Sequence, residues 1–362
     1  MSVHASIPAR QCAYAELLCV FGRWHGNAQE MADTQGGPEL VSRPCISGGH
    51  WTRGAANGLA YTINTSAIAG PGNAYSHCAG SYMNWTWVAD DDRCRMPLGP
   101  ADWCQALAGR AILFIGDSLS AQQVLSLLHL VGSSDLKWRK SGPVVDLTDD
   151  WRKTGAVKAC GGKVRINYIR NDELSDRSFE GGCHSVTRGP LASTKLCRPF
   201  TSSKLLADYD TLVLNTGAHM PTTSTFRMNE MVVNRTRQLA TWLRNTKHKL
   251  IWRTGVPGHV DCDKYSGPLE TGSHIAYPQR DSPQYRYRWD RIEPNDKIRA
   301  RIFEEVLPGR VRFLDAAALT RGRPDQHLLK GRFGGGKKDC LHYCLPGPID
   351  TWNMVLARML AH

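Results

Sequence analysis

From Arg110 onward, short apolar runs alternate with amphipathic segments along the chain. Residues 111–115 are nearly all apolar, as expected of a strand buried on both faces, and residues 119–131 place their apolar side chains along one helical stripe. The same patterns predict further strands at 164–169, 211–214, 250–252 and 311–314, and further helices at 229–245 and 349–360. This alternation predicts an α/β domain whose mostly parallel sheet is covered by helices on both faces.

The chain before Arg110 lacks this alternation. Residues 1–44 carry no sustained periodicity and contain a Gly36-Gly37-Pro38 break, which is typical of a poorly structured tail. Residues 45–104 are rich in Gly, Asn, Trp and Cys and contain few long apolar runs, so we expect loops held by disulfides. We therefore divide the chain into a tail at 1–44, a Cys-rich N-terminal region at 45–104 and the α/β domain at 105–362.

Cysteine usage indicates an oxidising compartment. Twelve cysteines are scattered from Cys12 to Cys344 instead of gathered in CxxC pairs, which disfavours a zinc module and favours disulfides. Three N-glycosylation sequons, at Asn64, Asn84 and Asn234, agree with this. Together these features favour a lumenal or extracellular protein.

Targeting segments and net charge say less about the location and partners of the protein. The apolar stretch at 13–22 contains Glu16 and is too short to span a bilayer, so it is either a weak signal sequence or a sign that the gene model has lost its true start. No other segment reaches transmembrane length, so no membrane anchor is evident in this chain. The net charge of +12 could attract phosphate or acidic polysaccharide, for example at Lys337-Lys338, but the basic residues are spread widely and predict no nucleic-acid partner.

One candidate for chemistry is the stretch ILFIGDSLS at 112–120. The predicted strand stops at Gly116, and Asp117 and Ser118 follow just before the predicted helix. Ser118 would then lie at the carboxyl end of a strand, where open α/β sheets bind ligands, and at a helix start whose N–H groups suit an oxyanion. Taken alone, such a triplet is more often an ordinary turn, in which Ser118 would cap the helix and Asp117 would be a turn residue.

A second candidate lies near the C-terminus. Asp339 precedes His342 by three residues, on a predicted loop before the last helix. The carboxylate could hold the Nδ1–H of the imidazole and leave Nε2 to take a proton from a hydroxyl. Asp325 with His327 is a rival pair at a less suitable spacing.

Two further groups of residues allow other interpretations. His219 and His259 could join a metal site with Asp261 or Cys262, although ordinary loop histidines are the simpler interpretation. Cys340 and Cys344 could pin the Asp339–His342 loop through disulfides, or, less simply, form a redox-active pair.

Taken jointly, a GDS triplet at the first strand-to-helix turn and a DxxH before the last helix resemble the GDSL or SGNH hydrolases. Intervening segments resemble the plant trichome birefringence-like (PC-esterase) family over roughly residue 85 to the C-terminus. These segments are Trp85-Thr86-Trp87, Cys94-Arg95-Met96-Pro97, 113–120 with Gln122-Gln123, Asn215-Thr216-Gly217 with His219, Arg253-Thr254 with Pro257 and His259, Arg323-Pro324-Asp325, and DCLHYCLPGPIDTWN at 339–353. The resemblance implies a three-layer SGNH-like (flavodoxin-like) sandwich, with 105–362 as its catalytic domain.

The family resemblance implies O-acetylation of a cell-wall polysaccharide in the Golgi, through a transiently acetylated serine. It assigns Ser118 as nucleophile, His342 as general base and then acid, and Asp339 as the partner that orients His342. Asn215 resembles the asparagine that donates to the oxyanion, although such a residue is as often a turn former. No bound cofactor is implied; an acetyl donor, acetyl-CoA or an acetylated intermediate from a membrane partner protein, is the cosubstrate.

Departures from the family pattern concern the acceptor. Ala218-His219-Met220 stands where the family usually has a His and then aromatic residues, and Val256 replaces a usual Ser. Two other functions stay open, a carbohydrate acetylesterase and a non-catalytic glycan-binding protein. Four tryptophans could stack on sugar rings or pack in the core: Trp85, Trp87, Trp252 and Trp352.

Overall fold

The protein is described from a computed structural model. It describes residues 49–53, 85–89, 99–132, 157–176, 179, 200–217, 219, 224–270, 276–280, 282–328 and 338–361. The chain divides into two compact units, residues 1–37 and 38–362, and every described residue belongs to the second.

A six-stranded sheet forms the centre of this unit. Its strands follow the order β4 (Val157–Ala159), β5 (Val164–Arg170), β3 (Ala111–Gly116), β6 (Thr211–Leu214), β7 (Lys249–Arg253) and β8 (Val311–Leu314). All neighbouring strands are parallel except β4, which pairs antiparallel with β5. The chain builds outward from β3 to both sides, so the order reverses beside the strand that leads into Ser118. The predicted mostly parallel sheet is confirmed.

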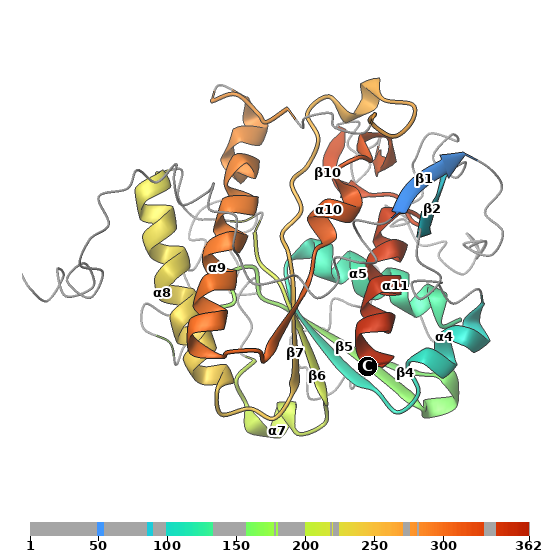
Figure 1. Cartoon of the computed structure of the whole chain (residues 1–362), viewed down its shortest axis with the longest axis vertical. Coiled ribbons are helices and arrows are strands. Elements are labelled where there is room, and N and C mark those ends of the chain that lie inside the picture. The colour runs from blue at the N-terminus through green and yellow to red at the C-terminus, as the bar shows by residue number, and fades with distance from the viewer. Residues whose placement is uncertain are drawn as a thin grey trace, which may run out of the picture. The chain divides into compact units, whose positions relative to one another are not determined.

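Helices cover both faces of the sheet (Figure 1). On one side α5 (Ser118–Leu130) packs against α11 (Pro348–Ala361), which also contacts α4 (Pro100–Ala106) and α10 (Ala316–Thr320). On the other side α8 (Thr225–Leu243) packs along α9 (Ile292–Val306). This is the three-layer α/β arrangement that the sequence predicts.

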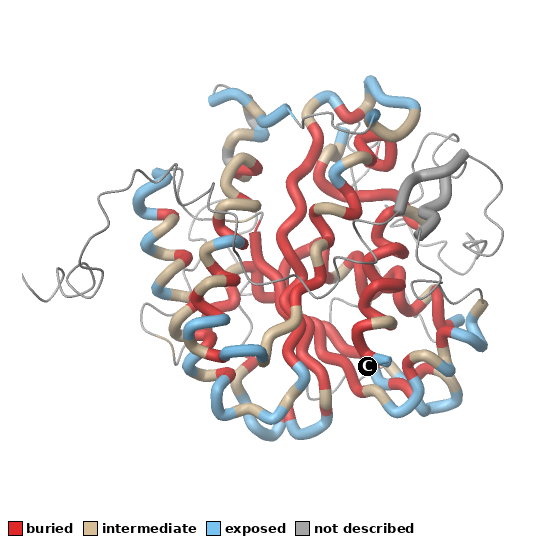
Figure 2. Tube along the Cα trace, viewed as in Figure 1, coloured by how far each residue is buried: buried red, intermediate tan, exposed pale blue. Residues whose placement is uncertain are grey.

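Strand β3 shows why its sequence is apolar without interruption. Ile112 and Phe114 belong to the hydrophobic cluster that includes α5 and α11, whereas Leu113 and Ile115 belong to the cluster that includes α8 and α9. Successive side chains of a strand point to opposite faces, so a strand between two helical layers needs apolar residues at every position. The central strands are accordingly buried along their length (Figure 2).

Helix α9 was not predicted, and α8 begins at Thr225, before the predicted 229. The inner face of α9 carries buried polar residues, Asn295, Asp296 and Arg299, among its apolar ones. Asp296 accepts hydrogen bonds from the Trp252 indole and from the backbone N–H of Gly255. These polar side chains interrupt the apolar stripe that periodicity analysis depends on.

The Cys-rich region contains more regular structure than expected. β1 (Gly49–Arg53) pairs antiparallel with β2 (Trp85–Ala89), where loops were predicted. Helix α4 crosses the predicted boundary at 104, and Cys104 within it forms a disulfide with Cys160. Residues 1–44, where the tail is predicted, lie outside the described residues.

The remaining described elements are short. β9 (His327–Leu328) pairs antiparallel with β10 (Asp339–Tyr343), and α7 spans Ser203–Leu206. Turns of 3-10 helix are η4 (Cys160–Gly162), η6 (Cys262–Lys264), η7 (Pro283–Tyr287), η8 (Trp289–Arg291) and η9 (Pro324–Gln326). Within the described ranges, no helix has the length and apolar character needed to cross a bilayer.

Candidate active site

Ser118 is the first residue of α5 and follows β3 after a single turn. Asp117 is the N-cap residue: its carboxylate accepts from the backbone N–H groups of Leu119 at 3.0 Å and Ser120 at 3.4 Å. The cap satisfies two of the N–H groups that a helix start leaves unpaired, and the N–H of Ser118 lies outside it. Asp117 therefore holds the turn, as predicted, while Ser118 is presented at the helix start.

Gly116 is required by close approach. A Cβ atom there would lie 2.4 Å from the Ser120 hydroxyl oxygen and 2.7 Å from the Asn215 carbonyl oxygen, so no side chain fits. The hydroxyl of Tyr168, from the neighbouring strand β5, donates to the carbonyl of Asp117 at 2.8 Å and lies 3.1 Å from that of Gly116. The turn is thus packed from the sheet side and supported by the adjacent strand.

His342 contacts both of its predicted partners. Its Nε2 lies 2.8 Å from the Ser118 hydroxyl oxygen, and its Nδ1 lies 2.8 Å from Oδ2 of Asp339. A carboxylate only accepts, so Nδ1 carries the imidazole proton and Nε2 accepts from the Ser118 hydroxyl. The structure therefore brings Ser118, His342 and Asp339 into one continuous chain of hydrogen bonds.

The Asp339 carboxylate is held in its charged form. Its other oxygen, Oδ1, accepts from the backbone N–H groups of Leu341 at 3.2 Å and His342 at 3.1 Å. Burial raises the pKa of Asp339, but the adjacent His342 and these hydrogen bonds outweigh burial and leave the pKa well below its ordinary value. The group is thus ionised and oriented toward Nδ1 of His342.

The predicted loop around Asp339 and His342 is instead a strand, which corrects the sequence analysis. β10 pairs with β9, with a register shift between Asp339 and Tyr343. The Gln122 side chain of α5 accepts from the N–H of Tyr343 at 3.2 Å and donates to its carbonyl. The Gln122 amide thereby forms hydrogen bonds with the backbone of β10 that a neighbouring strand would otherwise form. These bonds connect the helix that begins with Ser118 to the strand that contains His342.

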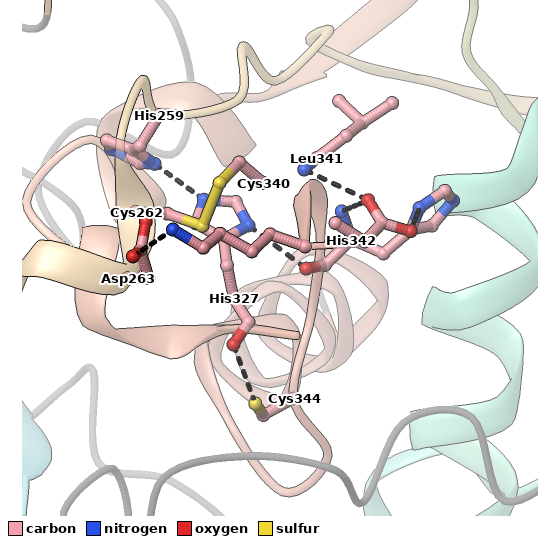
Figure 3. Close-up of a disulfide and its surroundings, with 10 residues drawn as sticks. His259, Cys262, Asp263, His327, Cys340, Leu341, His342 and Cys344 are labelled. Atoms are coloured by element: carbon pink, nitrogen blue, oxygen red, sulfur yellow. Dashed lines mark hydrogen bonds and ion pairs between the residues drawn. A yellow bond between two sulfur atoms is a disulfide. The ribbon is translucent and has the colours of Figure 1, made fainter. Parts of the chain in front are cut away.

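Disulfides hold the same strand from another side. Cys340 is bonded to Cys262 in η6 (Figure 3). Cys344 is disulfide-bonded as well. The expectation that disulfides flank His342 is confirmed. The alternative of a redox pair between Cys340 and Cys344 is wrong, because Cys340 pairs with a cysteine 78 residues earlier.

Arg253 and Asn215, at the ends of neighbouring strands, support the turn that precedes Ser118. Arg253 ends β7 and is fully buried; its Nη2 donates to the Ser120 hydroxyl at 3.1 Å and lies 3.6 Å from Oδ1 of Asp117. Burial lowers its pKa to about 10, so it stays charged at neutral pH. Asn215 donates from Nδ2 to the Arg253 carbonyl at 3.0 Å, and its Oδ1 lies 3.5 Å from the Ser120 hydroxyl. The oxyanion role of Asn215 stays a prediction.

Several other sequence candidates lie elsewhere or serve other contacts. Asp325 accepts two hydrogen bonds from Arg323, both at 2.9 Å, whereas Nδ1 of His327 faces the His342 carbonyl, so the rival pair is not formed. Trp252 and Trp352 are buried in the core, which rules out stacking on a sugar, and the side chains of Trp85 and Trp87 lie outside the described residues. Lys338 pairs with Asp263.

The proposed metal group is not assembled. Cys262 is bonded to Cys340, His259 contacts His327 and the Arg321 carbonyl, and His219 lies 3.9 Å from Asp172. The part of the chain that the structure describes contains no cluster of three or more His, Cys, Asp or Glu residues placed for a metal.

The motif at 350–353 serves packing between helices. Asp350 of α11 accepts from the Ser126 hydroxyl of α5, and the Asn353 amide donates to that hydroxyl at 2.9 Å and to the Gln123 carbonyl at 2.9 Å. These buried contacts join the helix that follows β10 to the helix that begins with Ser118. The sequence pattern shows these residues but not this role, since the partners are over 220 positions apart.

The chain is similar in sequence to known proteins over most of its length. Residues 98–359 match the PC-Esterase family, a GDSL/SGNH-like acyl-esterase family found in Pmr5 and Cas1p. The chain is 24% identical over 337 residues to protein trichome birefringence-like 26 of Arabidopsis thaliana, covering 77% of this chain and 68% of that protein. It is 23% identical over 363 residues to trichome birefringence-like 18 of the same plant, covering 84% and 63%. The chain thus spans about two thirds of the length of these two relatives.

The chain is also similar to a relative that is named as an enzyme. Xyloglucan O-acetyltransferase 1 of Arabidopsis thaliana is 23% identical over 344 residues, which cover 86% of this chain and 79% of that protein. The family match runs from just before α4 into α11 and includes Ser118, Asp339 and His342. Because the match covers most of the chain, this chain belongs to the PC-Esterase family.

Proposed function

We propose that this protein is a polysaccharide O-acetyltransferase that acts through an acetyl-serine intermediate on Ser118. The observation that carries the proposal is the continuous contact from Ser118 through His342 to Asp339, with both distances at 2.8 Å. Membership of an acyl-esterase family supports acyl chemistry, and the relative named xyloglucan O-acetyltransferase supports a polysaccharide acceptor.

In the first half-reaction the Ser118 oxygen attacks the carbonyl carbon of the acetyl donor. Its proton passes to Nε2 of His342, and the Asp339 carboxylate stabilises the imidazolium that forms. The backbone N–H of Ser118 at the start of α5, with the partial positive charge of the helix end, stabilises the oxyanion, and Asn215 is the predicted second donor. The tetrahedral intermediate then expels the donor's leaving group, which takes the proton from His342.

In the second half-reaction an acceptor hydroxyl gives its proton to His342 and attacks the acetyl carbonyl carbon. The bond to the Ser118 oxygen breaks, His342 returns the proton to Ser118, and the acetyl group stays on the sugar as an ester. Water in place of the sugar hydroxyl would release acetate with the same residues. The difference between transferase and esterase therefore depends on which hydroxyl reaches the acetyl-serine.

The donor and the compartment are part of the proposal. The acetyl group comes from acetyl-CoA or from an acetylated intermediate on a membrane partner, and no bound cofactor takes part. Disulfides at Cys104–Cys160 and Cys262–Cys340 support the secretory pathway, with the Golgi lumen as the proposed site. Asn234 of α8 is exposed, so a glycan attached to it would extend into solvent.

The test is an acetyl-transfer assay with the purified protein. A small acetyl ester serves as donor and unacetylated xyloglucan oligosaccharides as acceptors, and mass spectrometry follows acetylated product, acetate and acetyl-protein. Ser118→Ala should abolish transfer and acetyl-protein. Ser203→Ala, an exposed serine that begins α7, is the control and should retain both. Full transfer by Ser118→Ala would refute the mechanism.

Two other outcomes identify the alternatives. Acetate release that depends on Ser118, without acetylated oligosaccharide, would indicate an acetylesterase. Oligosaccharide binding that Ser118→Ala leaves unchanged, with no turnover, would indicate a glycan-binding protein.

A further inference from the structure

Two buried histidines lie behind the strand that carries His342. His259 follows β7 and His327 begins β9, and each is at most 3% exposed. Their rings face each other, with Nδ1 of His259 2.7 Å from Nε2 of His327 (Figure 3). The proposed chemistry makes no use of either ring.

The two outer nitrogens of the pair both face backbone carbonyls. Nδ1 of His327 lies 3.0 Å from the carbonyl oxygen of His342, and Nε2 of His259 lies 2.9 Å from that of Arg321. A carbonyl oxygen only accepts hydrogen bonds, so each outer nitrogen must carry a proton to form its bond. One proton on each ring is thereby assigned.

A neutral imidazole has a single N–H group. With both of these turned outward, two neutral rings would place bare lone pairs against each other at 2.7 Å, which is hydrogen-bond distance without a hydrogen. A third proton between the facing nitrogens removes the conflict and forms a charge-assisted hydrogen bond. We infer that His259 and His327 share this extra proton as an imidazole–imidazolium pair that positions the backbone of His342.

Sharing is what retains the proton. Burial lowers the pKa of His259 to about 4 and that of His327 well below its ordinary value, so neither ring would keep a second proton alone. In the pair, each ring supplies the acceptor for the other. The carboxylates of Asp325 and Asp339 also favour the charge on His259 and His327, respectively.

Other ionisable groups around the pair are accounted for. Arg323 on the side of η9 is paired with Asp325 in two hydrogen bonds. The Tyr343 ring lies 4.2 Å from that of His327, and burial raises the pKa of Tyr343 well above its ordinary value, so it stays neutral. His342 is a further group among the described residues, and its charge disfavours a proton on His327. The pair is thus the positive group directly behind β10.

The effect of the pair on catalysis rests on the proposed function. The hydrogen bond from His327 holds the His342 carbonyl, and the Gln122 amide holds the next residue, so the strand is fixed at two consecutive positions. The positive charge of the pair also opposes a second positive charge on His342. It therefore helps to keep Nε2 of His342 unprotonated in mildly acidic solution, where it must act as a base.

Nuclear magnetic resonance tests the shared proton without any assay of activity. The full chain is labelled with nitrogen-15 at histidine, and long-range proton–nitrogen spectra assign the protonated ring nitrogens. We expect one strongly deshielded N–H signal coupled to the pair, absent in His259→Gln and in His327→Asn. His129→Gln, which changes a half-buried histidine in the last turn of α5, should retain the signal. Two neutral rings with a single N–H each in the native protein would overturn the inference.

The second test distinguishes the charge of the histidine pair from its hydrogen bonds to the backbone. The amide of Asn in His327→Asn can still donate to the His342 carbonyl, and that of Gln in His259→Gln to the Arg321 carbonyl, but both variants lack the facing nitrogen. The acidic limb of the kcat/KM profile should move up by about half a pH unit in each. An equal loss at every pH without a shift would overturn the role of the charge. Failure of the proposed function would give a different result: acetyl transfer would survive in Ser118→Ala, and the N–H signal of the histidine pair would be unchanged.

Discussion

The two ends of the Ser118–His342 contact are held in different ways. Ser118 is positioned mainly by its immediate neighbours, because Gly116 ends β3 and Asp117 caps the helix that Ser118 begins. Tyr168 and Arg253, from neighbouring strands, support that turn. His342 is positioned by distant residues: the Gln122 amide binds the strand from 221 positions away, and the Cys262–Cys340 disulfide closes 78 residues. Local secondary structure places the nucleophile, whereas cross-links of the folded chain place the base.

The largest expected effect comes from the base end. Asp339→Asn should lower kcat for acetyl transfer by about 10³- to 10⁴-fold, because an amide cannot stabilise the imidazolium and can select the wrong tautomer of His342. Steady-state kinetics with the small acetyl ester and xyloglucan oligosaccharides measure it. Asp208→Asn is the control, since Asp208 is an exposed carboxylate that follows α7 and should have little effect on the rate. Equal losses in the two variants would contradict the assignment.

Removing the two disulfides one at a time distinguishes an effect on the stability of the fold from an effect on the position of β10. Removing Cys262–Cys340 with Ser at both positions should cost about 4 kcal/mol of unfolding free energy, and removing Cys104–Cys160 about the same, because the closed loops are similar in length. Only the first disulfide is attached to β10, so only its loss should also lower kcat of the folded protein.

Denaturant unfolding and kinetics at a temperature where both variants are folded make this comparison. If both double variants lose the same fraction of kcat, the base end does not depend on its cross-link more than on general stability.

Adding one methyl group at Gly116 should disrupt the turn that positions Ser118. Gly116→Ala should destabilise the fold by about 1–3 kcal/mol, because the new Cβ meets the Ser120 hydroxyl and the Asn215 carbonyl. Gly322→Ala has no atom within 4 Å of the added Cβ and is the control, expected to change stability by less than about 0.5 kcal/mol. Thermal and urea unfolding measure both. Similar stability of the two variants would show that the turn adapts and that Gly116 has another role.

A smaller effect is expected at the link between the two ends. Gln122→Ala leaves the buried N–H and carbonyl of Tyr343 without their side-chain partner and should cost about 1–3 kcal/mol. Transfer should fall about tenfold through kcat with KM little changed, because the acceptor is not touched. Gln122→Glu keeps an acceptor for the Tyr343 N–H and should fall between Gln122→Ala and the unaltered protein. An effect on KM alone would place Gln122 in the acceptor site instead.

The smallest effect concerns acid stability. The pKa of Asp339 is lower in the folded protein than the ordinary value near 4, so its charged form stabilises the fold at higher pH. This contribution is fully present above about pH 4 and is lost as pH falls toward the folded value. Urea unfolding between about pH 2 and pH 6 should therefore show a flatter acid limb for Asp339→Asn. A limb as steep as that of the unaltered protein would show that Asp339 is not charged in the fold.

The parts of the fold that the sequence predicts are those with simple side-chain patterns. β3 and α5 were predicted because a strand between two helical layers is wholly apolar and the helix on it has one apolar stripe. α9 was not, because Asn295, Asp296 and Arg299 occupy its buried face. Their partners lie on other elements, as in the bond from the Trp252 indole to Asp296, so their burial is not visible along the chain.

The same division holds in the candidate site. Asp339 and His342 are three residues apart, and the register shift of β10 between Asp339 and Tyr343 lets the carboxylate contact the ring and two backbone N–H groups. Spacing along the sequence captures such a contact. The strand itself was predicted as a loop, because its backbone is paired with short β9 and with a glutamine side chain, and neither produces an alternating pattern.

The sequence by itself determined the α/β layering, the capped turn at Ser118 and the Asp339–His342 pair, because each depends on residues that are close along the chain or repeat at a regular interval. Tertiary structure alone decided that His342 meets Ser118, that Gln122 and a disulfide fix its strand, and that His259 faces His327 behind it. These contacts join segments far apart in sequence. They exist because folding the sheet brings the ends of β3 and β7 together with β10, which no local pattern encodes.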